Sequence, residues 1–269
     1  MDTVSIDSLS LYSQLGSPGA ALLLDVRRDA AFDADDRLLA GALRAPANLV
    51  EFAGRMAQGR QVVVYCVHGH EVSQDAASAL RAGGLPALYL VGGIEAWKAG
   101  KFPTVLRRPE WKVPGGSRWI TRERPKIDRI ACPWLIRRFI DPLATFEYVP
   151  AAHVLAEAQA RSAIAYDLPG APVTHRGERC SFDALIEDFA LDDPALARLA
   201  TIVRGADTNR LDLAPECAGL LATSLGLSQR FSDDHEMLAH ALPVYDGLYA
   251  WCRREIEGGN APHAWDPNA

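Results

Sequence analysis

A cysteine lies where a buried strand is expected to give way to a helix, and this position is well suited to chemistry. The stretch "VVVYCVHGHEVSQDAA" spans residues 62–77, and Cys66 directly follows its apolar run. A loop that leads into a helix N-terminus points backbone N–H groups and the positive end of the helix dipole at one place. Both favour a thiolate, so we expect a lowered pKa and a nucleophilic sulfur. A buried cysteine that only fills space is the alternative.

The residues around Cys66 support an anion or sulfur site. Gly69 lets the backbone curl tightly, and two histidines add hydrogen-bond donors near neutral pH. An aspartate and an arginine end the first apolar run, where they either face the same site or form a surface pair. The predicted substrate-binding residues are Val67, His68, Gly69, His70, Glu71, Val72, Asp25 and Arg27.

The first third of the chain alternates strand-like and helix-like segments. Strands are expected at 21–27, 61–66 and 87–93, with helices at 48–59 and 73–84, the second capped by Ser73. This alternation predicts an α/β domain with a parallel sheet covered on both faces, whose ligands bind at the carboxyl ends of the strands. The proline- and glycine-rich stretch at 106–117 predicts a linker between a domain at 1–105 and a domain at 118–269.

Four motifs in this first domain resemble the rhodanese (sulfurtransferase) family. They are, in chain order, "LLLDVR", "LLAGALRAP", "YCVHGHEVS" and "LVGGIEAW". The resemblance implies a rhodanese-like parallel sheet and a persulfide formed on Cys66, cradled by the amides of residues 67–71, with no cofactor required. The family's usual arginine, five residues after the cysteine, is Glu71 here, and the loop is one residue longer before Ser73. Thiosulfate therefore lacks its guanidinium partner, whereas a small neutral or protein-bound persulfide donor needs none.

The second half predicts a mainly helical α+β domain. Short strands are expected at 145–150 and 163–169, and helices after Ser181, from Asp193 to a terminator at Gly205, and over 243–259. The segment 117–142 is strongly basic, which predicts either a solvated face or an anion site. The anion-site residues are Arg118, Arg122, Arg129 and Cys132.

Pro133 leaves the helix around Cys132 open to two interpretations. A helix that begins at Pro133 would expose free N–H groups beside the thiol. A helix that begins at Asp128 would be kinked by the proline and would place Asp128 and Cys132 on one face. Either arrangement puts a thiol near charge.

Histidine, cysteine and carboxylate side chains in the second domain offer ligands for a transition metal. "HRGERCSFD", "RGAD" and "SDDHE" contain them, although no spacing matches a standard zinc signature. Acidic residues in a first helical turn also have a local explanation in the helix dipole. The metal-ligand candidates are His175, His235 and Cys180.

The second domain also resembles the C-terminal domain of the chromate-resistance protein B family. The resemblance is carried by "WITRERPKIDRIACPWLIRRFIDP", "HRGERCSFD", "IVRGAD" and "SDDHEMLAHALPVYDGLYAWCRR". It implies a bacterial protein of chromate resistance, with a role in sensing or regulating the response. Here the family's usual N-terminal portion is replaced by the rhodanese-like domain.

Composition limits the remaining choices. A net charge of −6 argues against nucleic acid as a partner, and no apolar run is long enough for a membrane. Five scattered cysteines fit reduced thiols in the cytoplasm. The leading hypothesis is a sulfurtransferase or persulfide carrier that takes sulfur from a small-molecule donor, passes it to a thiol or protein acceptor, and is linked to oxyanion stress. The alternatives are a non-catalytic chromate or sulfate sensor and a metal-dependent redox protein.

Overall fold

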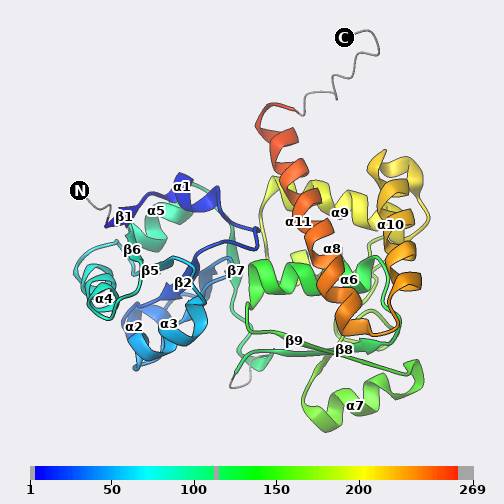
Figure 1. Ribbon diagram of the computed structural model, residues 1–269, viewed down its shortest axis with the longest axis horizontal. Coiled ribbons are helices and arrows are strands. Elements are labelled where there is room, and N and C mark those ends of the chain that lie inside the picture. The colour runs from blue at the N-terminus through cyan, green and yellow to red at the C-terminus, as the bar shows by residue number, and fades with distance from the viewer. Residues whose placement is uncertain (1–3, 112–114, 260–269) are drawn as a thin grey trace.

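The computed structural model describes residues 4–111 and 115–259. Its first domain is built on a five-stranded sheet in the order β1-β6-β5-β2-β4, in which each adjacent pair is parallel. The strands are β1 (Ser5–Ile6), β2 (Leu22–Asp25), β4 (Leu43–Arg44), β5 (Val62–Tyr65) and β6 (Ala87–Leu90). The helices are α1 (Ser8–Tyr12), α2 (Asp29–Asp33), α3 (Leu49–Ala57), α4 (Glu71–Ala82) and α5 (Gly93–Ala99). The predicted parallel α/β fold is confirmed (Figure 1).

The central strands form because successive residues bury opposite faces. In β5, Val62 and Val64 pack in the cluster that contains Ala77 and Leu80 of α4. Val63 and Tyr65 lie on the other face of the sheet, in the core cluster that contains Trp97 of α5. Since all four residues of β5 are buried, the strand is a continuous apolar run, as expected for a parallel sheet between helical layers.

The second domain combines a short parallel sheet with a helical bundle (Figure 1). Its sheet has the order β10-β8-β9, from β8 (Arg118–Arg122), β9 (Thr145–Val149) and β10 (Ile164–Ala165). The α-helices are α6 (Asp128–Leu135), α7 (Val154–Arg161), α8 (Ser181–Asp188), α9 (Pro194–Asp207), α10 (Glu216–Arg230) and α11 (Asp234–Gly258). Shorter helical segments are η1 (Pro109–Trp111), η2 (Ile136–Ile140), η3 (Ala151–His153) and η4 (Leu211–Leu213). The predicted α+β class is confirmed.

Pro133 lies inside α6, so of the two interpretations the helix that begins at Asp128 is the one observed. A proline has no N–H to donate to the carbonyl four residues earlier, which here belongs to Arg129. That carbonyl instead accepts a hydrogen bond from the hydroxyl of Tyr166 at 3.2 Å. The helix continues beyond Leu135 as the π-helical turn η2, so its whole length stays packed in the core.

Three sequence expectations for the second domain were wrong in detail. Helix α9 runs through Gly205 to Asp207, and a Cβ at Gly205 would clash with the sulfur of Cys217, so the glycine serves helix packing. Helix α8 is capped by Cys180 instead of Ser181. The strand expected at 163–169 is only two residues long, because the chain turns away at Asp167, whose φ is +57°. In the first domain α4 likewise begins two residues before Ser73.

The two domains share one continuous hydrophobic core. Strand β7 (Thr104–Leu106) pairs antiparallel with β3 (Arg37–Leu39), and the amide of Leu106 then donates to the carbonyl of Phe189 at 2.9 Å. Gly41 donates to the carbonyl of Phe139 at 2.7 Å across the same contact. The boundaries predicted at 105 and 118 stay predictions, and residues 1–3, 112–114 and 260–269 of the predicted segments lie outside the described residues. Among the described helices, none is long and apolar enough to cross a membrane.

Candidate functional site

Cys66 lies at the carboxyl edge of the parallel sheet, immediately after β5 and five residues before α4 begins. The residue is only 6% exposed, and its sulfur is 3.2 Å from the hydroxyl oxygen of Ser73. Burial raises the pKa of the thiol. The Ser73 hydroxyl and the backbone amides of His68, Ser73 and His70 outweigh that effect, so the pKa of Cys66 is lowered overall. The site therefore favours a thiolate.

Two glycines fix the loop that carries this sulfur. Gly69 has φ of +71°, and a Cβ there would clash with backbone atoms of the turn between β6 and α5. Gly93 of that turn has φ of +58°, and its Cβ would clash with the carbonyl of Cys66. The following amide, that of Ile94, donates to the Cys66 carbonyl at 3.0 Å. The Gly-Gly turn thus packs against the backbone of Cys66 and fixes its position.

The rim of the loop is polar and open to solvent. His68, His70 and Glu71 are exposed, and the two imidazole rings lie 5.9 Å apart between centroids. Val67 and Val72 are half-buried beside them. Glu71 is the first residue of α4, where its charge suits the helix N-terminus. The rim accordingly presents two imidazoles, with a carboxylate at the position where the rhodanese pattern has an arginine.

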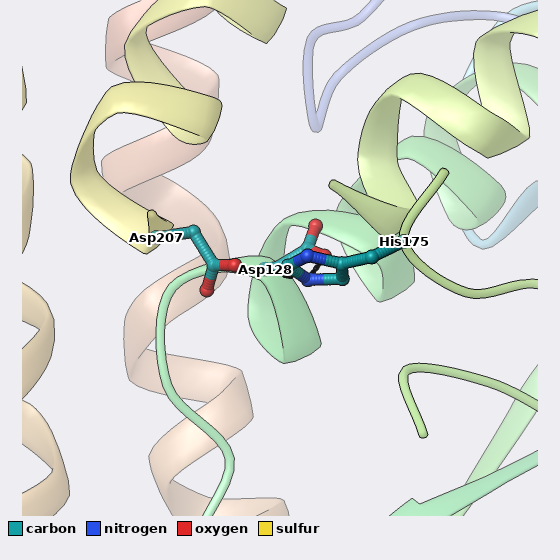
Figure 2. A group of neighbouring side chains, drawn as sticks. All are labelled: Asp128, His175 and Asp207. Carbon is teal, nitrogen blue, oxygen red and sulfur yellow. Dashed lines mark ion pairs between the residues drawn. The ribbon is translucent and has the colours of Figure 1, made fainter. Parts of the chain in front are cut away.

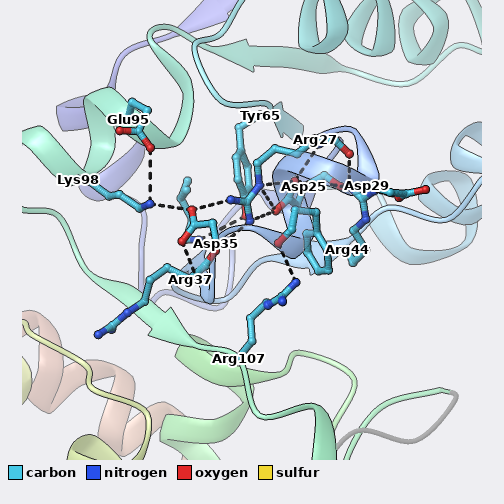
Figure 3. A network of polar contacts seen from close by, with 12 residues as sticks. Asp25, Arg27, Asp29, Asp35, Arg37, Arg44, Tyr65, Glu95, Lys98 and Arg107 are labelled. Atoms are coloured by element: carbon cyan, nitrogen blue, oxygen red, sulfur yellow. Dashed lines mark hydrogen bonds and ion pairs between the residues drawn. The ribbon is translucent and has the colours of Figure 1, made fainter.

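Asp25 and Arg27 are buried, so the surface pair considered for them was wrong. Figure 3 shows the network to which they belong. The Arg27 guanidinium donates to Asp25, to Asp35 at 2.7 Å and to the carbonyl of Arg37 at 2.8 Å, which uses all three of its nitrogens. The carboxylate of Asp25 also accepts the backbone amide of Arg27. Their role in binding substrate stays a prediction, and the geometry assigns them to supporting the sheet edge.

A second group of functional side chains lies in the helical domain, where Asp128, His175 and Asp207 point toward one another (Figure 2). The Nε2 atom of His175 is 3.2 Å from Asp207 and 3.7 Å from Asp128. It is also 3.3 Å from Asp167. One ligand atom from each residue drawn in Figure 2 lies within 4.8 Å of the others. Sequence spacing gave no sign of this group because its members come from a helix start, a loop and a helix end.

Mutual repulsion and burial define the electrostatics of this group. Burial, followed by the charges of Asp167 and Asp207, raises the pKa of Asp128 to about 7. Contact with Asp167 is the largest cause that raises the pKa of His175, which reaches about 9. Burial favours protonation of Asp167, but His175, the Ser181 hydroxyl and nearby arginines prevail and lower its pKa. The carboxylates therefore strongly attract positive charge.

The start of α6 is held in a strained conformation that positions Asp128. Ile127 has φ of +42°, a left-handed value that is unusual for a β-branched residue. Its amide donates to the Ser224 hydroxyl at 2.8 Å, and its carbonyl accepts from the Tyr245 hydroxyl at 2.7 Å. Backbone strain of this kind persists only where surrounding contacts enforce it, and it is concentrated at functional sites.

The predicted anion-site residues do not converge. Arg122 and Arg129 do meet, each 3.2 Å from the same oxygen of Asp167, so one carboxylate partly compensates the charge of both. Arg118 is exposed at the opposite end of β8. Cys132 is fully buried, donates to Asp128 at 3.4 Å, and has its pKa raised by burial and by that carboxylate. The anion site on these four residues stays a prediction without geometric support.

Of the three predicted metal ligands, only His175 belongs to a candidate ligand group among the described residues. His235 is exposed at the start of α11 with its ring against Tyr148, 5.3 Å away. Cys180 is buried at the start of α8, and its thiol lies 3.4 Å from Asp183. Burial and the charge of Asp128 raise the pKa of Cys180 well above its ordinary value, which disfavours the thiolate that a metal requires.

A hollow of about 730 Å³ adjoins this group, and arginines that the basic segment 117–142 does not contain line it. The lining arginines are Arg176, Arg179, Arg204 and Arg210. Each pairs with a carboxylate, for example Arg204 with Asp183 at 2.8 Å and Arg210 with Asp212 at 2.9 Å. The hollow is therefore polar, but its positive charge is largely neutralised.

Comparison with known proteins defines the two halves of the chain. Residues 9–100 match the rhodanese-like domain family, and residues 119–252 match the C-terminal domain of ChrB. The chain therefore consists of a rhodanese-like domain followed by a ChrB C-terminal domain, as the two resemblances predicted.

The second match extends to a curated relative, the protein ChrB of Cupriavidus metallidurans. Identity is 38% over 135 residues, which is 50% of this chain and 40% of that protein. The chain thus spans less than half the length of this relative.

Solved structures with similarity to the first domain include three that cover comparable parts of the chain. The rhodanese-like domain of an Anabaena protein is 31% identical, covering 42% of this chain and 86% of its own, with a TM-score of 0.34. A rhodanese-related protein from Thermoplasma volcanium is 27% identical, covering 38% and 98%, with a TM-score of 0.32. A thiosulfate sulfurtransferase from Pseudomonas aeruginosa is 28% identical, covering 38% and 19%, with a TM-score of 0.33.

Proposed function

We propose that Cys66 carries sulfane sulfur as a persulfide, in a protein whose second domain links this chemistry to chromate or oxyanion stress. The observation that carries the proposal is the sulfur position. A thiol follows a central strand, 3.2 Å from the Ser73 hydroxyl and facing amides that favour its ionised form. A thiolate at such a position is a competent nucleophile toward a sulfur–sulfur bond.

Sulfur is transferred in two steps, first from the donor to Cys66 and then from Cys66 to the acceptor. The Cys66 thiolate attacks the outer sulfur of a persulfide donor, the donor's sulfur–sulfur bond breaks, and the donor leaves as a thiolate. A thiol or cyanide acceptor then attacks the outer sulfur on Cys66 and restores the cysteine thiolate. The loop amides and the Ser73 hydroxyl stabilise negative charge on sulfur before and after transfer.

The rim of the site favours a donor of low charge. Glu71 is exposed where the rhodanese pattern places an arginine, so the dianion thiosulfate meets a carboxylate there. A neutral persulfide or a protein-bound one avoids that repulsion, and His68 and His70 offer it hydrogen bonds. We therefore expect a low-molecular-weight or protein persulfide to react faster than thiosulfate.

A second candidate function is an oxyanion sensor in which the first domain does not turn over. The arginine-lined hollow of the second domain is the observation in its favour, since guanidinium groups bind tetrahedral anions well. Each of those arginines already has a carboxylate partner, which weakens the case. Calorimetric titration with chromate and with sulfate tests it, and the absence of heat for both would remove this candidate.

Sulfur transfer to cyanide or to a thiol, measured for the wild type and for Cys66→Ala, tests the leading proposal. We expect turnover with a persulfide donor in the wild type and none in the variant. Cys252→Ala is a matched control, because that cysteine is fully buried between helices of the second domain. Equal activity of the wild type and Cys66→Ala would remove the sulfur-carrier function.

A further inference from the structure

The group formed by Asp128, His175 and Asp207 has the composition and spacing of a metal centre. We propose that these three side chains bind one divalent first-row transition-metal ion in the second domain, independently of the sulfur chemistry at Cys66. Figure 2 shows them converging from the start of α6, the loop before α8 and the end of α9. No sequence motif links these three positions, so the fold alone assembles them.

The distances fit an ion between the three side chains. Nitrogen and oxygen ligands bind such ions at about 2.1 Å, so neighbouring ligand atoms are roughly 3.0–3.6 Å apart for bond angles of 90–120°. The Nε2 atom of His175 is 3.2 Å from the Asp207 oxygen and 3.7 Å from the Asp128 oxygen. All three ligand atoms lie within 4.8 Å of one another. An ion can be seated by small rotations of side chains.

The donor set points to a transition metal. Imidazole suits Zn²⁺, Fe²⁺ and Co²⁺, and carboxylates add affinity for Mn²⁺, whereas Ca²⁺ and Mg²⁺ take oxygen ligands. The two cysteines in this region do not join the set, because Cys132 and Cys180 are buried thiols that lie against Asp128 and Asp183 respectively. One nitrogen and two carboxylates therefore define the site.

Surrounding contacts hold Asp128 in a fixed orientation. Its carboxylate accepts the amides of Ser181 at 2.7 Å and Phe182 at 2.9 Å, both at the start of α8. The oxygen that faces His175, Oδ2, accepts only the Ser181 amide and retains a further lone pair for an ion. The strained backbone of Ile127, just before Asp128, is kept in place by a hydrogen bond that it donates to α10 and one that it accepts from α11. Such support from surrounding groups is typical of metal ligands.

Asp167 completes the surroundings without being needed as a ligand. It accepts the Ser181 hydroxyl at 2.9 Å and lies between two arginines. Its other near neighbour is His175, at 3.3 Å. The two arginines compensate the charge of Asp167. Asp128 and Asp207 then supply two negative charges to balance a divalent cation.

The site is open on one side. The side chain of His175 is 40% exposed and that of Asp207 is 18% exposed, while Asp128 closes the inner side with no exposure. Three protein ligands with room for solvent or substrate are typical of reactive metal sites, whereas structural sites use four and are closed. The arginine-lined hollow begins at the residues that follow His175 and Asp207 in the chain.

Titration of the metal-free full-length protein with Zn²⁺, Mn²⁺ and Co²⁺ separately, by calorimetry, tests the proposal. We expect one ion per chain for at least one of these metals, and His175→Ala and Asp207→Asn to weaken its binding about tenfold or more. Both positions are partly exposed, so these variants should fold, which circular dichroism checks. Asp128→Asn is avoided as the primary variant because that carboxylate also caps α8.

Two control variants keep the assignment specific. His235→Ala removes an exposed histidine of the same domain, and Cys66→Ser removes the sulfur nucleophile; both should bind metal like the wild type. No binding by the wild type, or unchanged binding in folded His175→Ala and Asp207→Asn, would overturn the metal site. Loss of binding in Cys66→Ser would move the metal to the first domain and also overturn it. The metal titrations do not depend on sulfur transfer. If the sulfur-transfer assay failed, the proposed function would fall while the metal site would still be tested by these variants.

Discussion

Removing the hydroxyl of Ser73 should make Cys66 a weaker nucleophile at neutral pH. The hydroxyl oxygen is 3.2 Å from the cysteine sulfur, and both residues are almost fully buried, so solvent cannot replace the contact. A hydrogen bond to a charged group contributes about 1.5–3 kcal/mol. Because the loop amides remain in Ser73→Ala, we take the lower end, and about 1.4 kcal/mol corresponds to a tenfold change in thiolate population.

The rate at which iodoacetamide alkylates Cys66, followed by peptide mass spectrometry across a range of pH, measures this change. We expect Ser73→Ala to react about tenfold more slowly than the wild type at neutral pH, from the free-energy loss above. The two rates should converge at high pH, where both thiols are ionised. Ser78→Ala is the matched control, since Ser78 is exposed on the same helix and should leave the profile unchanged.

Two results would refute the reasoning. If Ser73→Ala followed the wild-type profile at every pH, the hydroxyl would not stabilise the thiolate. If its rate fell by the same factor at every pH, the hydroxyl would act through packing or access instead of charge. Thermal unfolding of the same samples separates a local change from a loss of folding.

Three further predictions concern the support around the sulfur site. Gly93→Ala should lower both the melting temperature and the reactivity of Cys66, because a Cβ at φ of +58° would meet the cysteine carbonyl; an unchanged melting temperature would contradict this. Asp25→Ala should cost about 3–5 kcal/mol in urea unfolding, because it leaves a buried guanidinium unpaired, and a loss below about 1 kcal/mol would argue against that. Lys98→Met should cost up to about 1 kcal/mol at pH 7, since the ammonium helps to lower the pKa of Asp35. That stabilisation exists above the unfolded value of about 3.9 and is lost as pH falls through the lowered pKa, so the two proteins should converge below that pKa; a constant difference would contradict the ion pair.

The sheet and its cysteine were predictable from the sequence because local patterns determine them. The apolar run that ends at Tyr65, the glycine-bearing loop and the alanine-rich helix are contiguous, and parallel sheets place such loops at the strand ends. The contact between Ser73 and Cys66 was missed because Ser73 was assigned to a helix cap. Since α4 begins at Glu71, Ser73 lies inside the first turn, and its side chain points back to the sulfur.

The group in the second domain was only partly predictable. His175 could be named as a ligand candidate from its type, but its partners come from positions 128 and 207, far away in sequence. Packing of α6, α8 and α9 brings them together, and no local pattern encodes that packing. Two of the three positions lie in motifs already named as sources of ligands, since "HRGERCSFD" contains His175 and "RGAD" contains Asp207, but nothing in the sequence joined them to Asp128.

The buried pair of Asp25 and Arg27 shows a different limit. A polar sequence at a strand end is compatible with a solvent-exposed pair and with a buried network, and the choice depends on what covers it. Here the guanidinium donates to Asp35 and to the Arg37 carbonyl in β3, and Lys98 pairs with the same aspartate. Asp35 and β3 follow Arg27 within about ten residues, but Lys98 is far away in sequence, so the burial of the pair could not be predicted from the first strand.

The measurement that tests the central claim most directly is peptide mass spectrometry of the intact protein after exposure to glutathione persulfide. If Cys66 carries sulfur, the peptide that contains it gains the mass of one sulfur atom, and a thiol acceptor then removes it. The buried cysteines at 132, 180, 217 and 252 should stay unmodified in the same sample. Sulfur found only on those four cysteines, or an unmodified Cys66 in a sample where the donor is still present, would contradict the account.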